Sequence, residues 1–396
     1  MSTTEDIPNV TDLNISEKWA PQLGYAEEPE TPLTADTFPS KSGGKPAWLN
    51  PEKILSINDV TCGLCEQPMV LLVQLYTPED FPPEAFHRTV YVFCCKNGTC
   101  VKQDWKKCFK VYRSQLPREN SYYPPPPENE EDDEEEIEFI PKKYKSPTLC
   151  VICGIEGTKA CGQCKSVHYC SREHQMVDWN MCLHKQFCKK INNLTPTEQQ
   201  QIEKLRQQRI FQEMEIVSEA EGRGEDGIEE DAQLQHTLEN SKNDNDENNT
   251  DPTAKALVPI GEEQEEDDTQ VDVDDTFLKF QLRIQLYPEQ ILRYDRVEYD
   301  MPDCEPLWVQ DDQKPPATIP TCEQCGGPRT FEFQLLSTLL NFLGVSHLAS
   351  DSLDWGSLYI YSCKRNCSSS QVFMPEFIWK QDFSSHGMKL GGTSGQ

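Results

Sequence analysis

The feature that most constrains this chain is its set of 18 cysteines, many of which stand in Cys-x2-Cys pairs. Residues 1–9 are polar and acidic and contain no apolar stretch like that of a secretory signal. We therefore expect a reducing compartment, where cysteines stay free for metal binding and do not form disulfides. Apolar runs such as 68–76 and 333–345 are far shorter than the roughly 20 residues that cross a bilayer, so we expect no membrane-spanning segment.

The densest group of cysteines and histidines lies in residues 150–188. Its members form four pairs, two of the form Cys-x2-Cys, one Cys-x3-His and one His-x3-Cys. Thiolate sulfur and imidazole nitrogen are common zinc ligands, and structural sites hold each ion with four of them. The spacing therefore predicts two zinc ions held by eight ligands, which are Cys150, Cys153, Cys161, Cys164, Cys170, His174, His184 and Cys188.

Two further cysteine groups repeat each other along the chain. Residues 61–68 and 321–328 both read Thr-Cys-x2-Cys-x2-Pro, and Gln-Leu follows six residues after each proline. The likeness resumes at 90–100 and 358–367, where cysteines again fall in matching positions. We therefore predict duplicated halves, each pinned by a closed four-cysteine zinc site as in a zinc ribbon. The predicted ligands are Cys62, Cys65, Cys95 and Cys100 in the first half and Cys322, Cys325, Cys363 and Cys367 in the second.

Four thiolates fill a tetrahedral zinc ion and leave no position for water or substrate, so we expect these two sites to be structural. Closing such a site can supply roughly 10 to 16 kcal/mol, whereas a typical domain is stable by about 5 to 15 kcal/mol. The alternative is that the cysteines are ordinary buried thiols. That alternative is our prediction for Cys94, Cys108 and Cys304, and off the central pattern we expect Cys182 to be a spare thiol and His168 a surface histidine.

The net charge of −30 sits mostly in two stretches of the sequence. Nine of the eleven residues in 128–138 are acidic, and 213–275 holds 23 acidic residues against three basic ones. Segments so charged and so poor in apolar residues are predicted to be disordered. They would also repel nucleic acid, so we expect no direct nucleic-acid partner.

The rest of the chain predicts an α+β architecture that is rich in β-structure. Residues 70–76 and 89–93 have the apolar, β-branched content of strands, and 277–287 suits a helix. Thr195 and Glu198 form a capping box that begins a helix expected to continue to about residue 217. We expect the duplicated half-domains to pack into one split domain with the finger inserted between them. The predicted boundaries are 1–16 disordered tail, 17–123 N-terminal half-domain, 124–146 acidic and Pro-rich linker, 147–190 finger, 191–217 helix, 218–275 disordered acidic tract, 276–384 C-terminal half-domain and 385–396 disordered tail.

The spacing of the central group, with the run HYCSREHQMVDWNMCLHKQFC, resembles the MYND zinc finger. That resemblance implies cross-braced ligand pairs, with Cys150, Cys153, Cys170 and His174 on one zinc and Cys161, Cys164, His184 and Cys188 on the other. His174 stands where most such fingers have cysteine. MYND fingers typically bind proline-containing peptides, which implies a peptide site at Ser171, Gln175 and Trp179. The alternative for Trp179 is that it only packs the small core of the finger.

Other segments resemble the programmed cell death protein 2 family. They are LGYAEEP, FPSKSGGKPAWL, AFHRTVYVFCC, PEQILRY, DWGSLYIYSC and EFIWKQD. The resemblance implies a dedicated chaperone that brings a newly made, basic small-subunit ribosomal protein of the S-five family into the assembling 40S subunit. It also implies effects on cell growth and a place in both cytoplasm and nucleus.

Two other functions compete with the chaperone. One is a nuclear adaptor whose MYND finger recruits proline-containing peptides of corepressor-like partners in control of transcription, cell growth or apoptosis. The other is an enzyme, because MYND fingers also occur in lysine methyltransferases. The sequence contains no Gly-rich phosphate loop, no His-Glu-x2-His pair and no three-ligand zinc set, so we expect no catalysis.

Overall fold

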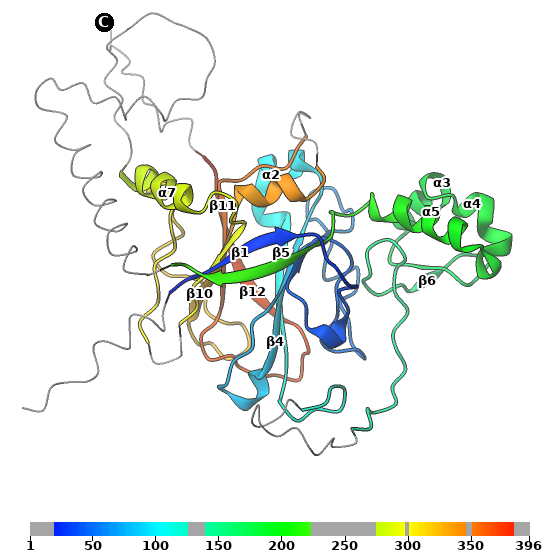
Figure 1. The fold of residues 1–396 in the computed structure, drawn as a ribbon, viewed down its shortest axis with the longest axis horizontal. Coiled ribbons are helices and arrows are strands. Elements are labelled where there is room, and N and C mark those ends of the chain that lie inside the picture. Colours follow the sequence, from blue (N-terminus) through cyan, green and yellow to red (C-terminus); the bar gives the residue numbers. More distant parts are fainter. Residues whose placement is uncertain (1–19, 126–138, 223–274, 298–300, 346–350, 384–396) are drawn as a thin grey trace, which may run out of the picture.

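The computed structural model describes residues 20–125, 139–222, 275–297, 301–345 and 351–383 (Figure 1). The predicted tails 1–16 and 385–396, and most of the predicted tract 218–275, lie outside the described residues. Ten strands form a closed barrel in the order β1-β8-β2-β3-β4-β5-β12-β11-β10-β9, with every neighbouring pair antiparallel. The strands are β1 Gln22–Glu27, β2 Lys41–Ser42, β3 Val70–Tyr76, β4 His87–Cys94, β5 Phe109–Leu116, β8 Met214–Ala220, β9 Leu292–Tyr294, β10 Arg329–Leu336, β11 Ser357–Cys363 and β12 Met374–Gln381.

The helices are short and few among the described residues. Around the barrel are α2 Gly98–Asp104, α7 Asp275–Leu286 and the 3-10 turns η1 Ala35–Thr37, η2 Pro83–Ala85, η3 Trp105–Lys107 and η6 Ser337–Phe342. The part on the right of Figure 1 holds β6 Lys159–Ala160, β7 His168–Tyr169, α3 Arg172–Met181, α4 His184–Phe187, η4 Cys188–Asn193 and α5 Pro196–Gln207. No helix in the described ranges is long and apolar enough to cross a membrane.

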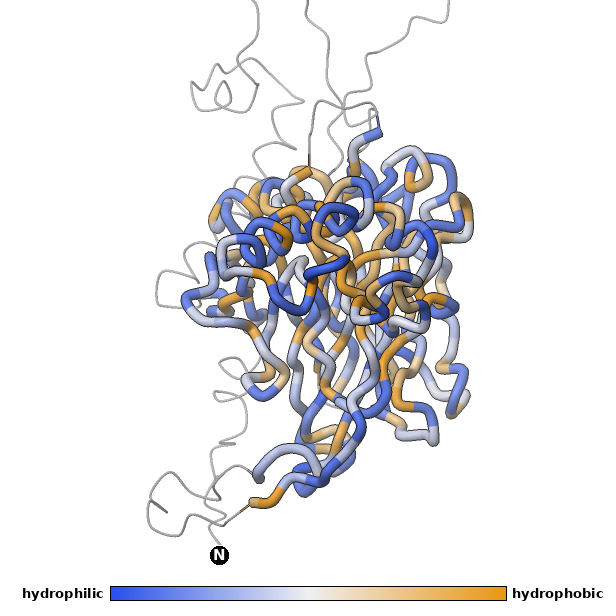
Figure 2. Tube along the Cα trace, turned by 90° about the vertical axis from the view of Figure 1, so that its right-hand side faces the viewer, coloured by the Kyte–Doolittle hydropathy of each residue, from blue (hydrophilic) through white to orange (hydrophobic). Residues whose placement is uncertain are grey.

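The core of the molecule lies inside the barrel. All eight residues of β4 and all eight of β10 are buried, as are six of the seven in β3. In Figure 2 the hydrophobic stretches gather towards the inside of the molecule, and hydrophilic stretches predominate in the surrounding loops. Burial of apolar surface on this scale is the main favourable term in folding. The strands predicted at 70–76 and 89–93 and the helix predicted at 277–287 are confirmed by β3, β4 and α7.

Two predictions about local structure are wrong. The capping box at Thr195 and Glu198 is present, but its helix α5 ends at Gln207, and residues 214–220 form strand β8 instead of continuing the helix. Strand β8 pairs with both β1 and β2, so sheet closure outweighs the weak helical preference of this acidic segment. The disordered tract predicted for 218–275 also starts too early, because residues 218–220 belong to β8.

The two halves of the chain build matching parts of the barrel. In the first half β3 pairs with β4, and the register shifts between Leu71 and Val73. In the second half β10 pairs with β11, and the register shifts between Phe331 and Phe333. Each shift lies between the third and the fifth residue after the proline that follows the Cys-x2-Cys pair, so the bulges occupy corresponding places on the two hairpins.

A buried glutamine and tyrosine clamp the loop before β3. The side chain of Gln74 accepts a hydrogen bond from the backbone N–H of Ala47 at 2.9 Å and donates one to its carbonyl at 3.0 Å. The hydroxyl of Tyr91 donates to the same carbonyl at 3.2 Å and accepts from the N–H of Leu49 at 2.8 Å. Four hydrogen bonds thus satisfy the polar groups of a loop that the barrel buries.

The second half has the same clamp on the loop before β10. Gln334 accepts from the N–H of Leu307 at 2.9 Å and donates to its carbonyl at 3.1 Å. The hydroxyl of Tyr359 donates to that carbonyl at 3.2 Å and accepts from the N–H of Val309 at 3.1 Å. The clamped segments read Lys-Pro-Ala-Trp-Leu at 45–49 and Glu-Pro-Leu-Trp-Val at 305–309. The likeness between the halves therefore extends to a motif that the sequence analysis did not pair.

Buried ion pairs join the halves. Arg88 on β4 pairs with Glu332 on β10, and both side chains are fully buried. Burial alone would raise the pKa of Glu332, but the adjacent guanidinium groups of Arg88 and Arg296 hold it at about 2. Arg113 on β5 donates to Glu376 on β12 at 2.8 Å in an equally buried pair. Removal of one side chain from either pair leaves its buried partner with weaker charge compensation, so the halves depend on each other.

We predict that Arg88→Leu destabilises the protein by about 3 to 5 kcal/mol, because Glu332 is left charged inside the barrel with only Arg296, 3.9 Å away, to compensate it. The measurement is the free energy of unfolding from urea titration at neutral pH. The matched control is the double variant Arg88→Leu, Glu332→Leu, which removes both charges and is expected to recover most of the loss. A double variant no more stable than the single one would contradict this account.

Candidate metal centres

The finger is assembled from two tight turns, a two-stranded sheet and a short helix. Strands β6 and β7 pair through Lys159 with Tyr169 and Ala160 with His168. Helix α3 starts after Ser171, whose hydroxyl accepts a hydrogen bond from the N–H of His174 at 3.2 Å. This cap fixes the first turn of α3. Cys170 and His174 are thereby held on either side of the helix start.

All four Cys-x2-Cys turns have the same geometry. In each, the N–H four residues after the first cysteine donates to the carbonyl of that cysteine, at 2.8 to 3.0 Å. The donating residue has a positive φ, which favours glycine. It is Gly154 in one turn and Gly326 in another, with φ of 74° and 67°. In the other two turns it is Glu66 and Lys165, with φ of 58° and 57°.

The sixteen predicted ligands come together in four groups of four. Within each group the candidate ligand atoms all lie within 4.8 Å of one another. The finger holds two groups with the cross-braced pairing, and each half of the barrel holds one. The groups are Cys150, Cys153, Cys170 and His174; Cys161, Cys164, His184 and Cys188; Cys62, Cys65, Cys95 and Cys100; and Cys322, Cys325, Cys363 and Cys367.

The distances fit a tetrahedral ion. Zinc–sulfur bonds of about 2.3 Å in a tetrahedron put neighbouring sulfurs about 3.8 Å apart. The Sγ atoms of Cys153 and Cys170 are 3.7 Å apart, and those of Cys161 and Cys188 are 3.8 Å apart. A disulfide would bring two sulfurs to about 2.05 Å, and all 18 cysteines are free. The donor sets therefore suit zinc.

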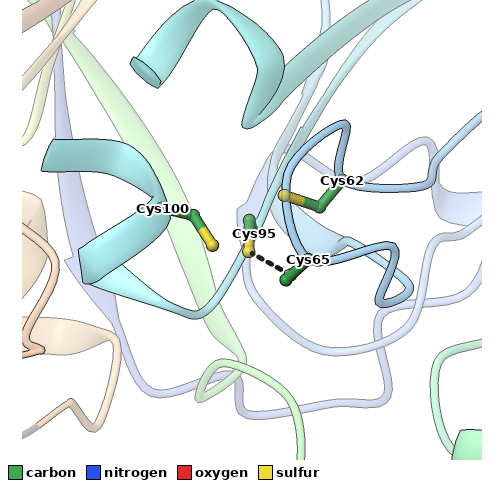
Figure 3. Close-up of side chains that lie close together, drawn as sticks. All are labelled: Cys62, Cys65, Cys95 and Cys100. Carbon is green, nitrogen blue, oxygen red and sulfur yellow. Dashed lines mark hydrogen bonds between the residues drawn. The ribbon is translucent and has the colours of Figure 1, made fainter. Parts of the chain in front are cut away.

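The barrel sites sit at the ends of strands. Figure 3 shows Cys62 and Cys65 on a loop that faces Cys95, which follows β4, and Cys100, which lies on α2. The Sγ atoms of Cys65 and Cys95 are 3.7 Å apart. In the second half the Sγ distances are 3.6 Å from Cys322 to Cys367 and 3.7 Å from Cys325 to Cys363. Each site ties a loop to the end of a hairpin.

The cysteines predicted to be spare lie outside the four groups. Cys94 and Cys182 are buried, and burial raises the pKa of both thiols. Cys108 is also buried and lies 3.9 Å from Cys62, but its thiol donates to the carbonyl of Asp104 at 3.3 Å. Burial and the nearby Cys62 raise the pKa of Cys108 to about 12, which favours the neutral thiol. Cys304 is half-buried.

Asp178 is a site residue that the sequence analysis missed. Its buried carboxylate accepts hydrogen bonds from the hydroxyl of Tyr169 at 2.7 Å and from Arg206 at 2.8 and 3.0 Å. The same carboxylate lies 3.4 Å from Nδ1 of His184, whose Nε2 faces the sulfur of Cys161 at 3.4 Å. A carboxylate behind a metal-binding histidine fixes the orientation and tautomer of its ring. Burial lowers the pKa of His184, which favours the neutral imidazole that binds metal.

The residues predicted to bind a peptide lie along one side of α3. Ser171 is buried and its hydroxyl is used as the helix cap. Gln175 is half-buried. Trp179 is half-buried as well, and its ring lies 5.6 Å from the ring of His184 and packs against the core of the molecule. Peptide binding at these positions stays a prediction.

The finger is fixed to the barrel at several points. The indole N–H of Trp48 donates to the carbonyl of Gly154 at 2.9 Å, and the N–H of Glu156 donates to the carbonyl of Leu55 at 2.9 Å. A side chain at position 154 would place its Cβ 2.8 Å from Lys45, so glycine permits this close approach. The metal groups of the finger are therefore held in a defined position on the first half of the barrel.

We predict that Cys95→Ser removes the metal ion from the first barrel site, whereas Cys94→Ser, one residue earlier, leaves the metal content unchanged. Only Cys95 lies in the four-sulfur group. The measurement is the zinc content of each purified variant by elemental mass spectrometry. The repeat makes Cys94→Ser a suitable control, because Ser362 stands at the matching position in the second half. Equal zinc content in the two variants would rule out the assigned ligand set.

We predict that Asp178→Ala weakens zinc binding in the finger about 10- to 100-fold, the usual effect of removing a carboxylate behind a histidine ligand. The variant also leaves Arg206 without its buried partner. Zinc transfer to a colorimetric chelator measures the affinity. Asp178→Asn keeps a hydrogen-bond acceptor beside His184 and is expected to lose less than Asp178→Ala. If both variants held zinc as tightly as the parent chain, Asp178 would have no part in the site.

Comparisons with known proteins agree with this organisation. The profile of the programmed cell death protein 2 N-terminal domain matches residues 20–130, that of its C-terminal putative domain matches 274–382, and that of the MYND finger matches 150–188.

Programmed cell death protein 2 of Bos taurus is 35% identical over 375 residues, covering 92% of this chain and 96% of that protein. The protein of that name from Mus musculus is 35% identical over 369 residues, covering 91% and 96%. Programmed cell death protein 2-like of Mus musculus is 27% identical over 355 residues, covering 87% and 90%. No solved structure matches the chain. The chain is a member of the programmed cell death protein 2 family and contains a MYND finger.

Proposed function

We propose that this chain is a zinc-stabilised binding protein that chaperones a newly made, basic small-subunit ribosomal protein of the S-five family and supports assembly of the 40S subunit. The observation that carries the proposal is the combination of four closed ligand groups with a net charge of −30. Closed groups suit a rigid scaffold, and a strongly negative charge attracts a cationic client and suppresses its contacts with RNA. The identity of the client follows from the family resemblance.

Within this proposal the chain binds four zinc ions, two in the finger and one in each half of the barrel. Each group supplies four Cys or His ligands and so completes the coordination of its ion. Zinc therefore stabilises the fold, and the protein acts by binding and not by catalysis. We infer that the two halves are duplicates of one half-domain. Their matching register shifts and clamps support this inference.

A nuclear adaptor is the second candidate, and the finger supports it less well. The hydroxyl of Ser171 already caps α3, and Trp179 packs beside His184. An adaptor would need these side chains for its peptide. One observation favours the adaptor: Met176 and Met181 on α3 are about half exposed, so the finger has an apolar surface that a peptide could contact. We propose that the chaperone occurs in both cytoplasm and nucleus, because ribosomal proteins are made in the cytoplasm and assembled into subunits in the nucleus.

Native mass spectrometry of the chain purified from a eukaryotic host tests the proposal. We expect four zinc ions and a copurifying small basic protein at equal stoichiometry, identified as the S-five ribosomal protein by peptide sequencing. A Trp179→Ala variant should keep this client, whereas an adaptor would lose its peptide partner. A chain that carries zinc but never the ribosomal protein, from a host that makes both, would overturn the chaperone function.

A further inference from the structure

Strand β1 is only partly covered on one side. Residues Gln22–Gly24 pair with β9, but residues 25–27 continue past the end of β9 and pair only with β8. Apart from its pairing with β8, the backbone of residues 25–27 has no backbone hydrogen bond to another segment among the described residues. Natural proteins usually cover or blunt such an edge, because its unpaired N–H and C=O groups can pair with another strand. The exposed edge is therefore a feature that needs a partner.

The open edge lies in a groove of about 610 Å³. One wall is formed by β1 and β8, and the other by the turn after α7 and by η6. The volume is in the range of about 300 to 1,000 Å³ that ligand-binding sites occupy. The lining residues are Tyr25, Ala26, Glu27, Val217, Glu219, Pro288, Glu289, Thr338, Asn341 and Phe342.

The charge in this groove is all of one sign. Glu27, Glu219 and Glu289 are exposed along it, and no Lys, Arg or His lines it. None of the three carboxylates forms an ion pair with a described residue. Burial raises the pKa of Tyr25, and the nearby Glu219 raises it further. Apolar surface from Tyr25, Val217 and Phe342 lies between these charges.

A larger hollow near the finger differs in this respect. It measures about 860 Å³, and four of its five charged side chains pair with one another. Lys41 pairs with Glu213, and Lys45 with Glu203 at 2.7 Å. Lys204, its fifth charged side chain, forms no ion pair with a described residue, so this hollow would not attract a basic segment. The groove beside β1 combines unpaired carboxylates with an open strand edge.

We propose that the groove binds an extended segment of a partner protein, rich in Lys and Arg, which adds to the barrel as a strand beside residues 25–27. Backbone hydrogen bonds from the edge would provide affinity, and the carboxylates would select basic side chains. A second copy of this chain is a poor occupant, because it would bring three more carboxylates to the same place. The inference deepens the proposed function and rests on it for the identity of the partner.

The test uses the full chain and a fluorescein-labelled peptide in which Arg and Val alternate. We expect the variant Glu27→Gln, Glu219→Gln, Glu289→Gln to bind this peptide at least about tenfold more weakly by fluorescence anisotropy. The matched control is Glu84→Gln, Glu119→Gln, Glu323→Gln, which removes the same charge from exposed glutamates outside the groove. Both variants keep the acidic run 128–138, and the groove variant removes only one of the 23 acidic residues in 213–275, so general charge attraction is nearly the same in the two. Equal binding by the two variants would overturn the inference.

A second peptide separates strand addition from charge attraction alone. The same sequence with every second backbone nitrogen methylated keeps its charge but cannot pair along one edge, and we expect it to bind at least about tenfold more weakly to the parent chain. Equal binding of the two peptides would overturn the added strand. Sedimentation of the chain alone tests self-pairing, and a dimer broken by Ala26→Pro would assign the edge to a second copy.

Failure of the groove and failure of the proposed function give different results. If the groove variant still copurifies with the ribosomal protein but no longer binds the peptide, the ribosomal protein binds elsewhere on the chain. The groove is then not the site of the client. If the parent chain binds the peptide through the groove but carries no ribosomal protein from the eukaryotic host, the groove stands and the chaperone function falls.

Discussion

Neither half of the chain can close the sheet alone, and the rest of the structure depends on this constraint. The barrel closes only because β5 of the first half pairs with β12 of the second, and β1 pairs with β9. Charged pairs such as Arg88 with Glu332 cross between the halves inside the barrel. Because buried charges are costly without their partners, the ion pairs also select this arrangement over others with the same apolar surface.

The same constraint determines where the finger lies. The chain leaves the barrel after β5, forms the finger, and must return through α5 to place β8 between β1 and β2. Both connections of the finger are thus anchored in one sheet. Arg206 on α5 reaches Asp178 behind the candidate ligand His184, so the returning helix also completes the finger. The candidate metal centres of the finger and the closed barrel therefore share this returning helix.

Sequence patterns identified which cysteines and histidines come together, because the spacing within each pair is a local property. A Cys-x2-Cys turn places its two sulfurs near each other whatever surrounds it, and the repeat identified which distant cysteines join each turn. The strands β3 and β4 and the helix α7 were also predictable from local apolar patterns. Asp178 could not be found in this way, since its role depends on contacts with Tyr169 and Arg206 that arise only in the fold.

Strand β8 shows why other parts of the fold could not be predicted from local sequence patterns. Its sequence follows a genuine helix signal and opens an acidic stretch, and neither feature indicates a strand. Residues 214–220 are extended because β1 and β2, from the start of the chain, lie on either side of them, about 170 to 200 residues away in sequence. Pairing between strands so far apart in sequence produces no signal in the local pattern of residues.

The finger also breaks the likeness between the halves. Trp48 and Trp308 occupy the same position in two matching clamps. The indole of Trp48 is buried and donates to the finger at Gly154, whereas the indole of Trp308 is half-exposed and donates to its own neighbour Glu305. The clamp that contains Trp48 therefore holds the finger, whereas the clamp that contains Trp308 is partly exposed to solvent. An inserted module can thus be held rigidly by a residue whose backbone position was already fixed by the hydrogen bonds of the barrel.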